Sequence, residues 1–155
     1  MKLRFIWIGK TRSAPVRELI EDYFGRIRRF AQFDVTELRD AVGPGSDPVA
    51  AMETEGERIL ESTKPDPFVV LLDETGRQFR SAEFAEVIRE HMGKGTKRMT
   101  FVIGGHMGSS PAVKERADLV LSLSRMTFTH EIARALLAEQ VYRAFTIVNN
   151  LPYQK

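Results

Sequence analysis

The sequence contains a glycine-rich segment that could bind a ligand through its backbone. Gly104-Gly105-His106-Met107-Gly108 follows an apolar run and precedes Ser110-Pro111, a pair typical of a helix start. Amides of such a segment can approach a ligand closely because glycine has no side chain. The spacing differs from the Gly-x-Gly-x-x-Gly of dinucleotide sites and the Gly-Lys-Ser/Thr of phosphate loops. Two interpretations of the glycines remain, a ligand-binding loop and a tight turn that needs positive φ.

A second segment, Ser122 to Thr129, mixes hydroxyl and apolar side chains where a strand is expected to end and a helix to begin. Its backbone amides and carbonyls could hold the edge of an adenine. The alternative is a strand exit followed by a helix cap, which explains Thr129 but not the run from Leu123 to Met126.

Other chemistries find no support in the residue spacing. His91, His106 and His130 are not at metal-ligand intervals from one another or from a carboxylate, so no metal site is expected. Ser109 and Ser110 lack the Gly-x-Ser-x-Gly elbow of a hydrolase. The chain has no cysteine, which excludes thiolate chemistry and favours a reducing, cytoplasmic location.

Strands and helices are expected to alternate along the chain. Apolar runs of strand length alternate with segments whose apolar residues recur every three or four positions. This pattern predicts an α/β fold with a mostly parallel sheet covered by helices on both faces. The expected strands are 3–8, 33–38, 68–72, 99–103 and 119–123, and the expected helices are 15–27, 48–60, 82–92, 112–117 and 130–145.

Ligands of such sheets bind at the carboxyl ends of the strands. Three expected loops lie at that edge in the second half of the chain: Asp73 to Arg77, Gly104 to Ser109, and Ser122 to Thr127. The final helix carries a broad apolar surface that suits a core or a dimer face. Arg134 and Arg143 on that helix could contact phosphate or be ordinary surface charges.

Length and charge set further limits. A chain of 155 residues with 43% hydrophobic residues fits one compact domain over residues 1–155. No window resembles a signal peptide or a membrane span, so no membrane partner is expected. The net charge is only +2, so RNA binding would depend on local basic clusters. The candidates are Arg26, Arg28 and Arg29, then Arg77 and Arg80, then Lys94, Lys97 and Arg98.

Four groups of residues together form a pattern seen in a known family: Phe101-Val102-Ile103-Gly104-Gly105, the run from Leu121 to His130, Glu139-Gln140-x-Tyr142-Arg143-Ala144-Phe145, and Pro152-Tyr153. With them the chain resembles the ribosomal large subunit methyltransferase H family of the SPOUT class, and the resemblance extends from the opening strand to the last residues. It implies a C-terminal trefoil knot and a homodimer that uses S-adenosylmethionine. It further implies methylation of N3 of a pseudouridine in the large-subunit (23S) rRNA of the assembled ribosome.

Residue roles follow from the same resemblance, position by position. Tyr142 and Arg143 are expected near the target base or the rRNA backbone, and the tail residues Tyr153 and Gln154 complete the expected catalytic group. A valine at position 105 is expected to fill the space of the ligand. The residues expected to bind the cofactor are Leu72, Gly105, Leu123, Ser124, Arg125, Met126, Thr127 and Phe128.

The sequence departs from the family at two positions. His106 stands where the family usually has proline or a small residue, and Gln154 stands where the tail usually has histidine. Loss of the N3 proton would be helped by a base, and glutamine cannot be one. Glutamine can still orient the target base, and positioning alone can supply much of the rate. The departure at Gln154 leaves open a non-catalytic ribosome-binding factor that keeps the cofactor pocket. A methyltransferase for another RNA is a further alternative, because the charge pattern does not identify an RNA sequence.

Overall fold

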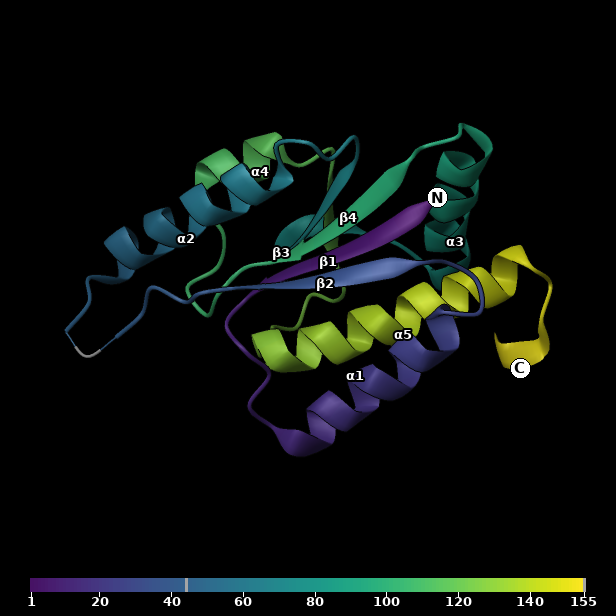
Figure 1. The fold of residues 1–155 in the computed structure, drawn as a ribbon, viewed down its shortest axis with the longest axis horizontal. Coiled ribbons are helices and arrows are strands. Elements are labelled where there is room, and N and C mark those ends of the chain that lie inside the picture. The colour runs from purple at the N-terminus through teal and green to yellow at the C-terminus, as the bar shows by residue number, and fades with distance from the viewer. Residues whose placement is uncertain (44, 155) are drawn as a thin grey trace.

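The computed structural model describes residues 1–43 and 45–154, without the side chain of Gln154. Strands and helices alternate as expected from the sequence (Figure 1). A short 3-10 helix, η1 (Pro152–Gln154), follows the last α-helix. The strands are β1 (Lys2–Ile8), β2 (Phe33–Leu38), β3 (Val69–Gln78), β4 (Arg98–Ile103) and β5 (Leu119–Ser122). The helices are α1 (Ala14–Ile27), α2 (Pro48–Thr63), α3 (Ser81–Gly93), α4 (Pro111–Arg116) and α5 (His130–Val148).

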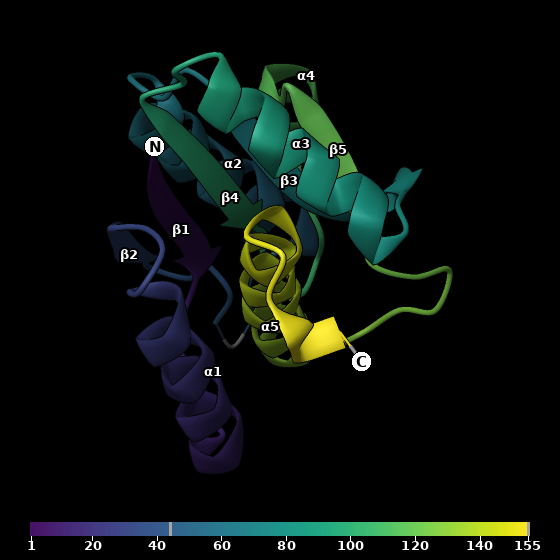
Figure 2. The ribbon, with the colours of Figure 1, turned by 90° about the vertical axis from the view of Figure 1, so that its right-hand side faces the viewer.

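The strands form one parallel sheet in the order β2-β1-β4-β3-β5. Helices α1, α3 and α5 cover one face, and α2 and α4 cover the other (Figures 1 and 2). Each face has its own core because successive strand residues point to opposite sides. On β1, for example, Phe5 joins the core under α1, α3 and α5, while Ile6 joins the core under α2 and α4. The expected α/β fold with helices on both faces is therefore confirmed.

Strand β3 is longer than expected, and this corrects one of the expected loops. Leu72 and Arg77 both pair with Leu121 of β5, so the residues between them form an irregularity within the strand. Gly76 lies so close to β5 that a Cβ there would be 2.7 Å from the carbonyl carbon and oxygen of Val120. The apolar run that marks β3 in the sequence ends at Leu72, and the polar residues after it concealed the second pairing segment.

Helix starts follow the sequence signals only in part. Asp47 and Thr129 cap α2 and α5 by accepting hydrogen bonds from backbone N–H groups. Ser13 occupies the cap position of α1 but makes no such bond with its side chain. Instead, the carboxylate of Glu131 on α5 accepts the N–H groups of Arg12 and Ser13 at 2.9 and 3.0 Å. The N-terminal ends of α1 and α5 are thereby joined.

Helix α5 spans the molecule from one edge of the sheet to the other. It begins at the carboxyl ends of the strands and ends near the start of β1, where the C-terminal η1 also lies (Figure 1). No helix in the described ranges is long and apolar enough to cross a membrane. The trefoil knot and the assignment of residues 1–155 to a single domain stay predictions.

Candidate functional site

A cavity of about 790 Å³ opens at the carboxyl edge of the sheet. The irregular part of β3 (Leu72 to Thr75), the ends of β4 and β5, and the segments that follow β4 and β5 form its walls. This is the edge where ligands of parallel sheets bind. Lining residues already expected from the sequence are Leu72, Gly105, Leu123, Ser124, Met126, Thr127 and Phe128. Arg125 is exposed and does not line this cavity, so its role in cofactor binding stays a prediction.

The glycine segment is both a cavity wall and a tight turn. The N–H of Gly108 donates to the carbonyl of Gly105 at 3.1 Å, and Gly108 has a φ of +85°. A Cβ on Gly104 would lie 2.7 Å from the Ser109 Oγ and 2.8 Å from the Gly108 carbonyl oxygen. Glycine at position 104 is therefore required by the turn itself.

Gly105 is confined by a side chain rather than by the turn. A Cβ on this residue would lie 2.3 Å from Oε2 of Glu55, on helix α2. The expectation that a valine here fills the space of the ligand stays a prediction, and the first atom added would meet the protein's own carboxylate. The glycine segment is held between the cavity on one side and α2 on the other.

Glu55 is a functional candidate that the sequence reasoning missed. Its side chain is 2% exposed, and Oε1 accepts the N–H of Ala41 at 2.9 Å. Oε2 is buried and has no hydrogen-bond partner among the described residues. The available signal was its place on the buried stripe of α2 between Ala51 and Ile59, where an acidic residue is unusual.

The wall from β3 carries paired charges. Asp73, whose side chain is 8% exposed, forms an ion pair with Lys114 at 2.9 Å. Asp73 also accepts hydrogen bonds from the Thr75 N–H and hydroxyl at 2.9 and 2.5 Å. Burial alone would raise the pKa of Asp73, but the bonds from Thr75 and Lys114 lower it overall, so the carboxylate stays charged.

The wall from β5 is tied to the β3 wall. The Thr127 hydroxyl donates to Glu74 Oε2 at 2.9 Å, and Ser124 Oγ accepts the Met126 N–H at 2.9 Å. These bonds shape the segment while Met126, 75% exposed, and Phe128 present apolar surface at the cavity. The segment from Ser122 to Thr129 thus contains a turn, a wall of the cavity and the N-terminal cap of α5.

His130 closes the cavity at the start of α5. Burial lowers its pKa, and the neighbouring Arg134 lowers it further. The imidazole is therefore neutral at neutral pH. Within the described residues, no group of three or more His, Asp or Glu side chains is placed to hold a metal ion.

Three of the expected catalytic residues, Tyr142, Arg143 and Tyr153, form a separate cluster with Tyr23 and Glu139, which we call the tail cluster. Both Nε and Nη2 of Arg143 donate to Glu139 Oε1, at 2.9 and 2.6 Å, and the guanidinium lies 4.8 Å from the centre of the Tyr153 ring. The Tyr153 hydroxyl lies 3.3 Å from both the Tyr23 hydroxyl and Glu139 Oε1. Burial and the bond to Tyr23 raise the pKa of Tyr153.

The tail cluster does not line the cavity. From His130 to Arg143 the helix rises by roughly 20 Å at about 1.5 Å per residue. The tail cluster lies at the far end of α5, near η1 (Figure 1). Within one chain, the structure therefore separates the expected cofactor residues from the expected catalytic residues. The side chain of Gln154 lies outside what the structure describes.

Arg134 is not a surface charge. Its side chain is fully buried, and it donates to the Ile8 carbonyl at 2.5 Å and to the Thr11 hydroxyl at 2.8 Å. The guanidinium also lies 5.1 Å from the centre of the Trp7 ring. Burial lowers the pKa of Arg134 to about 10. Contact between this side chain and phosphate is thereby excluded, and the residue instead holds the end of β1 against α5.

Comparison with known proteins defines the class. The family model described as predicted SPOUT methyltransferase matches residues 1–154. A probable methyltransferase from Bordetella pertussis shares the fold, with a TM-score of 0.58 and 17% identity over 93% of this chain and 96% of that one. The chain therefore belongs to the SPOUT methyltransferases.

Sequence relatives place it more closely. Ribosomal RNA large subunit methyltransferase H of Trichlorobacter lovleyi is 45% identical over 99% of both chains. The protein of the same name from Geotalea daltonii is 44% identical, again over 99% of both. The resemblance seen in the sequence is thus confirmed, and the chain is a methyltransferase of the large subunit methyltransferase H group.

Proposed function

We propose that this protein transfers the methyl group of S-adenosylmethionine to N3 of a pseudouridine in large-subunit (23S) rRNA of the assembled ribosome. The cavity at the carboxyl edge is the observation that carries the proposal, because it is built from the segments that the family resemblance assigns to the cofactor. The names of the relatives support rRNA as the substrate. A cytoplasmic location accords with that substrate and stays a prediction.

The cavity residues fit this cofactor. Leu72, Leu123 and Phe128 offer apolar surface to an adenine ring, and the glycine segment leaves backbone groups accessible. Asp73 and Glu74 are hydrogen-bond acceptors for hydroxyl or ammonium groups. A neutral His130 adds no positive charge next to a cationic sulfonium. When bound, the cofactor supplies an electrophilic methyl group.

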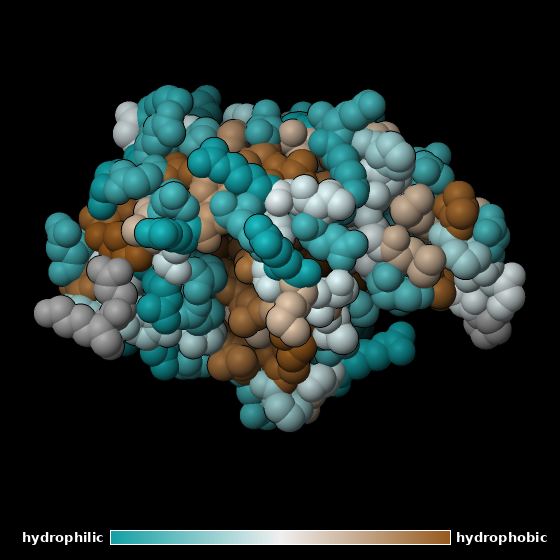
Figure 3. Space-filling view, turned by 180° about the vertical axis from the view of Figure 1, so that it is seen from behind, coloured by the Kyte–Doolittle hydropathy of each residue, from teal (hydrophilic) through white to brown (hydrophobic). Residues whose placement is uncertain are grey.

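The active site is proposed to form between two copies of the chain. Catalysis needs the cofactor and the RNA-facing residues together, whereas one chain holds them at opposite ends of α5. A homodimer in which each tail cluster faces the partner's cavity brings them together. Large apolar side chains are exposed on the two helices that we assign to the dimer contact, Leu19 on α1 and Ile132 on α5. Figure 3 shows apolar side chains gathered in the lower middle of the rear face, where α5 lies.

In this dimer, the tail cluster positions the RNA. Arg143 stays cationic because its hydrogen bonds to Glu139 raise its pKa, so it suits a phosphate or a developing negative charge. Tyr153 keeps its proton because its pKa is raised, so it donates a hydrogen bond rather than removing a proton. Tyr142 offers a ring face, and Gln154 is assigned the orientation of the target base. Catalysis then depends mainly on positioning.

Labelled S-adenosylmethionine and ribosomes that lack the modification test the proposed reaction. Transfer to assembled ribosomes is expected, with little transfer to isolated large-subunit rRNA or to tRNA. Binding of cofactor and ribosome without transfer would favour the non-catalytic ribosome-binding factor. Transfer to a different RNA would keep the enzyme and replace the substrate.

Mixed dimers test the shared site. Gly105→Val damages the cavity and Arg143→Ala damages the tail cluster, so each homodimer should be inactive. If each site uses both subunits, a mixed dimer retains one intact site, and random mixing restores about a quarter of wild-type activity. No recovery, with mixed dimers verified by mass, would show that each chain builds its own site.

A further inference from the structure

Two basic clusters that are far apart in the sequence meet at the amino edge of the sheet. Arg28 lies just after α1, and Lys97 lies just before β4. Lys2, at the start of β1, joins them, because its N–H donates to the carbonyl of Lys97 at 3.0 Å. The sequence alone gave no reason to connect Arg28 with Lys97.

These residues line two adjoining hollows, which we together call the amino-edge groove. Their volumes are about 430 and 640 Å³, and they share Lys2, Ala31 and Gln32 as walls. Arg28 lines the smaller hollow, and Lys97 and Arg98 line the larger one. The groove is therefore a continuous concave surface with cations along its length.

The cations of the groove are largely uncompensated. Lys2, Arg28 and Lys97 are exposed, and within residues 1–43 and 45–154 none of them forms an ion pair with a carboxylate. The acidic residue in the groove wall, Asp34, is held by Arg4 at 3.3 Å. The net charge presented along the groove is positive.

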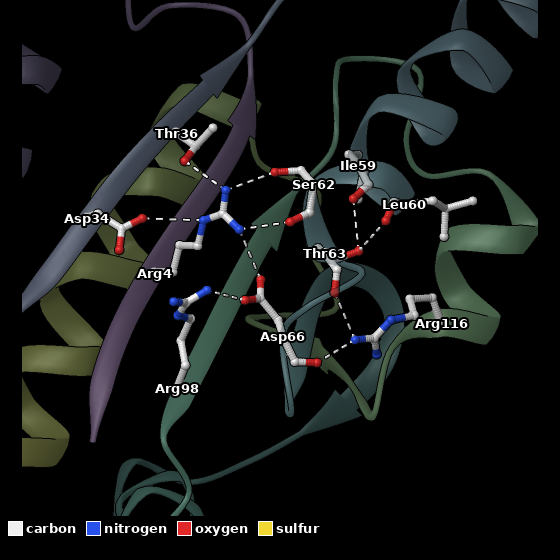
Figure 4. Close-up of polar contacts among 10 residues, drawn as sticks. All are labelled: Arg4, Asp34, Thr36, Ile59, Leu60, Ser62, Thr63, Asp66, Arg98 and Arg116. Atoms are coloured by element: carbon white, nitrogen blue, oxygen red, sulfur yellow. Dashed lines mark hydrogen bonds and ion pairs between the residues drawn. The ribbon is translucent and has the colours of Figure 1, made fainter.

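Buried polar contacts hold one wall of the groove in place. The Asp66 side chain is 0% exposed and receives Arg4 at 3.2 Å and Arg98 at 2.7 Å. Arg116 donates to the carbonyls of Thr63 and Asp66 at 3.1 and 2.7 Å, on the turn between α2 and β3 (Figure 4). This turn supplies Pro65 and Pro67 to the groove. The wall is thus fixed before any ligand binds.

Aromatic contacts connect the groove to the tail cluster. Phe30 lines the larger hollow, and its ring centre lies 6.1 Å from that of Tyr142. Tyr142 in turn contacts Tyr153, with ring centres 4.6 Å apart. An RNA strand bound in the groove would therefore lie next to the tail cluster, to which we assign RNA positioning.

We propose that the amino-edge groove binds the phosphate backbone of the RNA next to the nucleotide that is modified. The inference rests on the proposed function and adds a second contact surface to it. Lysine and arginine spaced along a concave surface bind phosphates, and aromatic faces beside them suit unpaired bases. Because the net charge of the chain is only +2, such a local groove is needed to attract RNA.

Binding to ribosomes as a function of salt tests the groove. The variant Arg28→Gln/Lys97→Gln should bind ribosomes about tenfold more weakly, and the slope of log affinity against log salt should fall by about one to two. KM for ribosomes should rise while kcat changes little. Affinity for S-adenosylmethionine, measured by calorimetry, should stay unchanged, which also shows that the variant is folded.

The matched control is Lys10→Gln/Arg39→Gln, which removes one lysine and one arginine that are exposed and lie outside the groove. Equal salt slopes for both variants and wild type would overturn the proposal, as would equal losses in both. Lys2→Gln/Lys97→Gln serves as a second test variant and should reproduce the first. The readout is binding, so the test of the groove does not depend on methyl transfer. If the wild-type protein binds ribosomes without methylating them, the proposed function is contradicted, and the binding of the variants still decides whether the groove contacts RNA.

Discussion

The carboxylate of Glu55 lies directly behind Gly105, with Oε2 at 2.3 Å from the position that a Cβ on Gly105 would take. This contact joins α2 to the segment that lines the cofactor cavity. The φ of residue 105 is not positive, so a larger residue there would be limited by the Glu55 carboxylate, which would have to move, and not by backbone strain. It also places a carboxylate oxygen that has no hydrogen-bond partner among the described residues directly beside a residue that lines the cavity.

Gly105→Ala is expected to weaken S-adenosylmethionine binding because the new methyl group pushes the glycine segment away from Glu55 and into the cavity. Adding Glu55→Ala removes the clash and should recover most of the affinity. The coupling free energy should be about 1–3 kcal/mol, measured by calorimetry on both single variants and the double variant. Strictly additive effects would show that the two residues act independently.

Gly76→Ala is expected to lower the free energy of unfolding by about 1–3 kcal/mol. The added Cβ would lie 2.7 Å from backbone atoms of Val120, which cannot move without separating β3 from β5. Gly93→Ala is the control, since a Cβ there meets nothing within 4 Å. Thermal unfolding of both variants gives the comparison, and equal melting temperatures would contradict the tight contact between the strands.

His130 should make the fold less stable in acid. Its pKa in the folded chain is lowered, first by burial and then by Arg134, so the unfolded chain takes up the proton more readily. Stability should therefore fall as the pH drops through the ordinary histidine value of about 6.5. In His130→Asn, the melting temperature should depend less on pH between about 7.5 and 5. Some dependence should persist, because burial also lowers the pKa of His91.

Arg134→Ala is expected to lower the free energy of unfolding by about 2–4 kcal/mol, because Thr11 and the Ile8 carbonyl lose their partner and a cavity is left. Arg134→Met, which fills the space, should cost less. Chemical denaturation measures both. Arg143→Ala should change stability little and should weaken ribosome binding strongly. A large loss of stability in Arg143→Ala, with little loss in Arg134→Ala, would contradict the assignment of Arg134 to the fold and of Arg143 to RNA binding.

The sequence was sufficient for the element order because each strand and helix has its own apolar period. It also located the cavity, since loops after parallel strands converge at one edge. It missed Glu55, because an acidic residue on a buried helix stripe becomes informative only when the facing glycine is known. The second half of β3 was also missed, since Asp73 to Gln78 carry few apolar side chains.

Relationships across long sequence separations were not predictable from periodicity. Nothing in the local pattern distinguishes buried Arg134 from half-exposed Arg143, because their environments are set by β1 and by the tail. The separation of the tail cluster from the cavity likewise depends on the length and direction of α5 in the folded chain. These features needed the three-dimensional structure.

The position of the transferred methyl group tests the central proposal most directly. Ribosomes that lack the modification are incubated with the protein and labelled S-adenosylmethionine, and the nucleosides of the 23S rRNA are then separated and identified by mass spectrometry. We predict label on N3 of a single pseudouridine, and none with Gly105→Val. Label on another nucleotide, or no label from protein shown to bind both the cofactor and the ribosome, would contradict the proposed function.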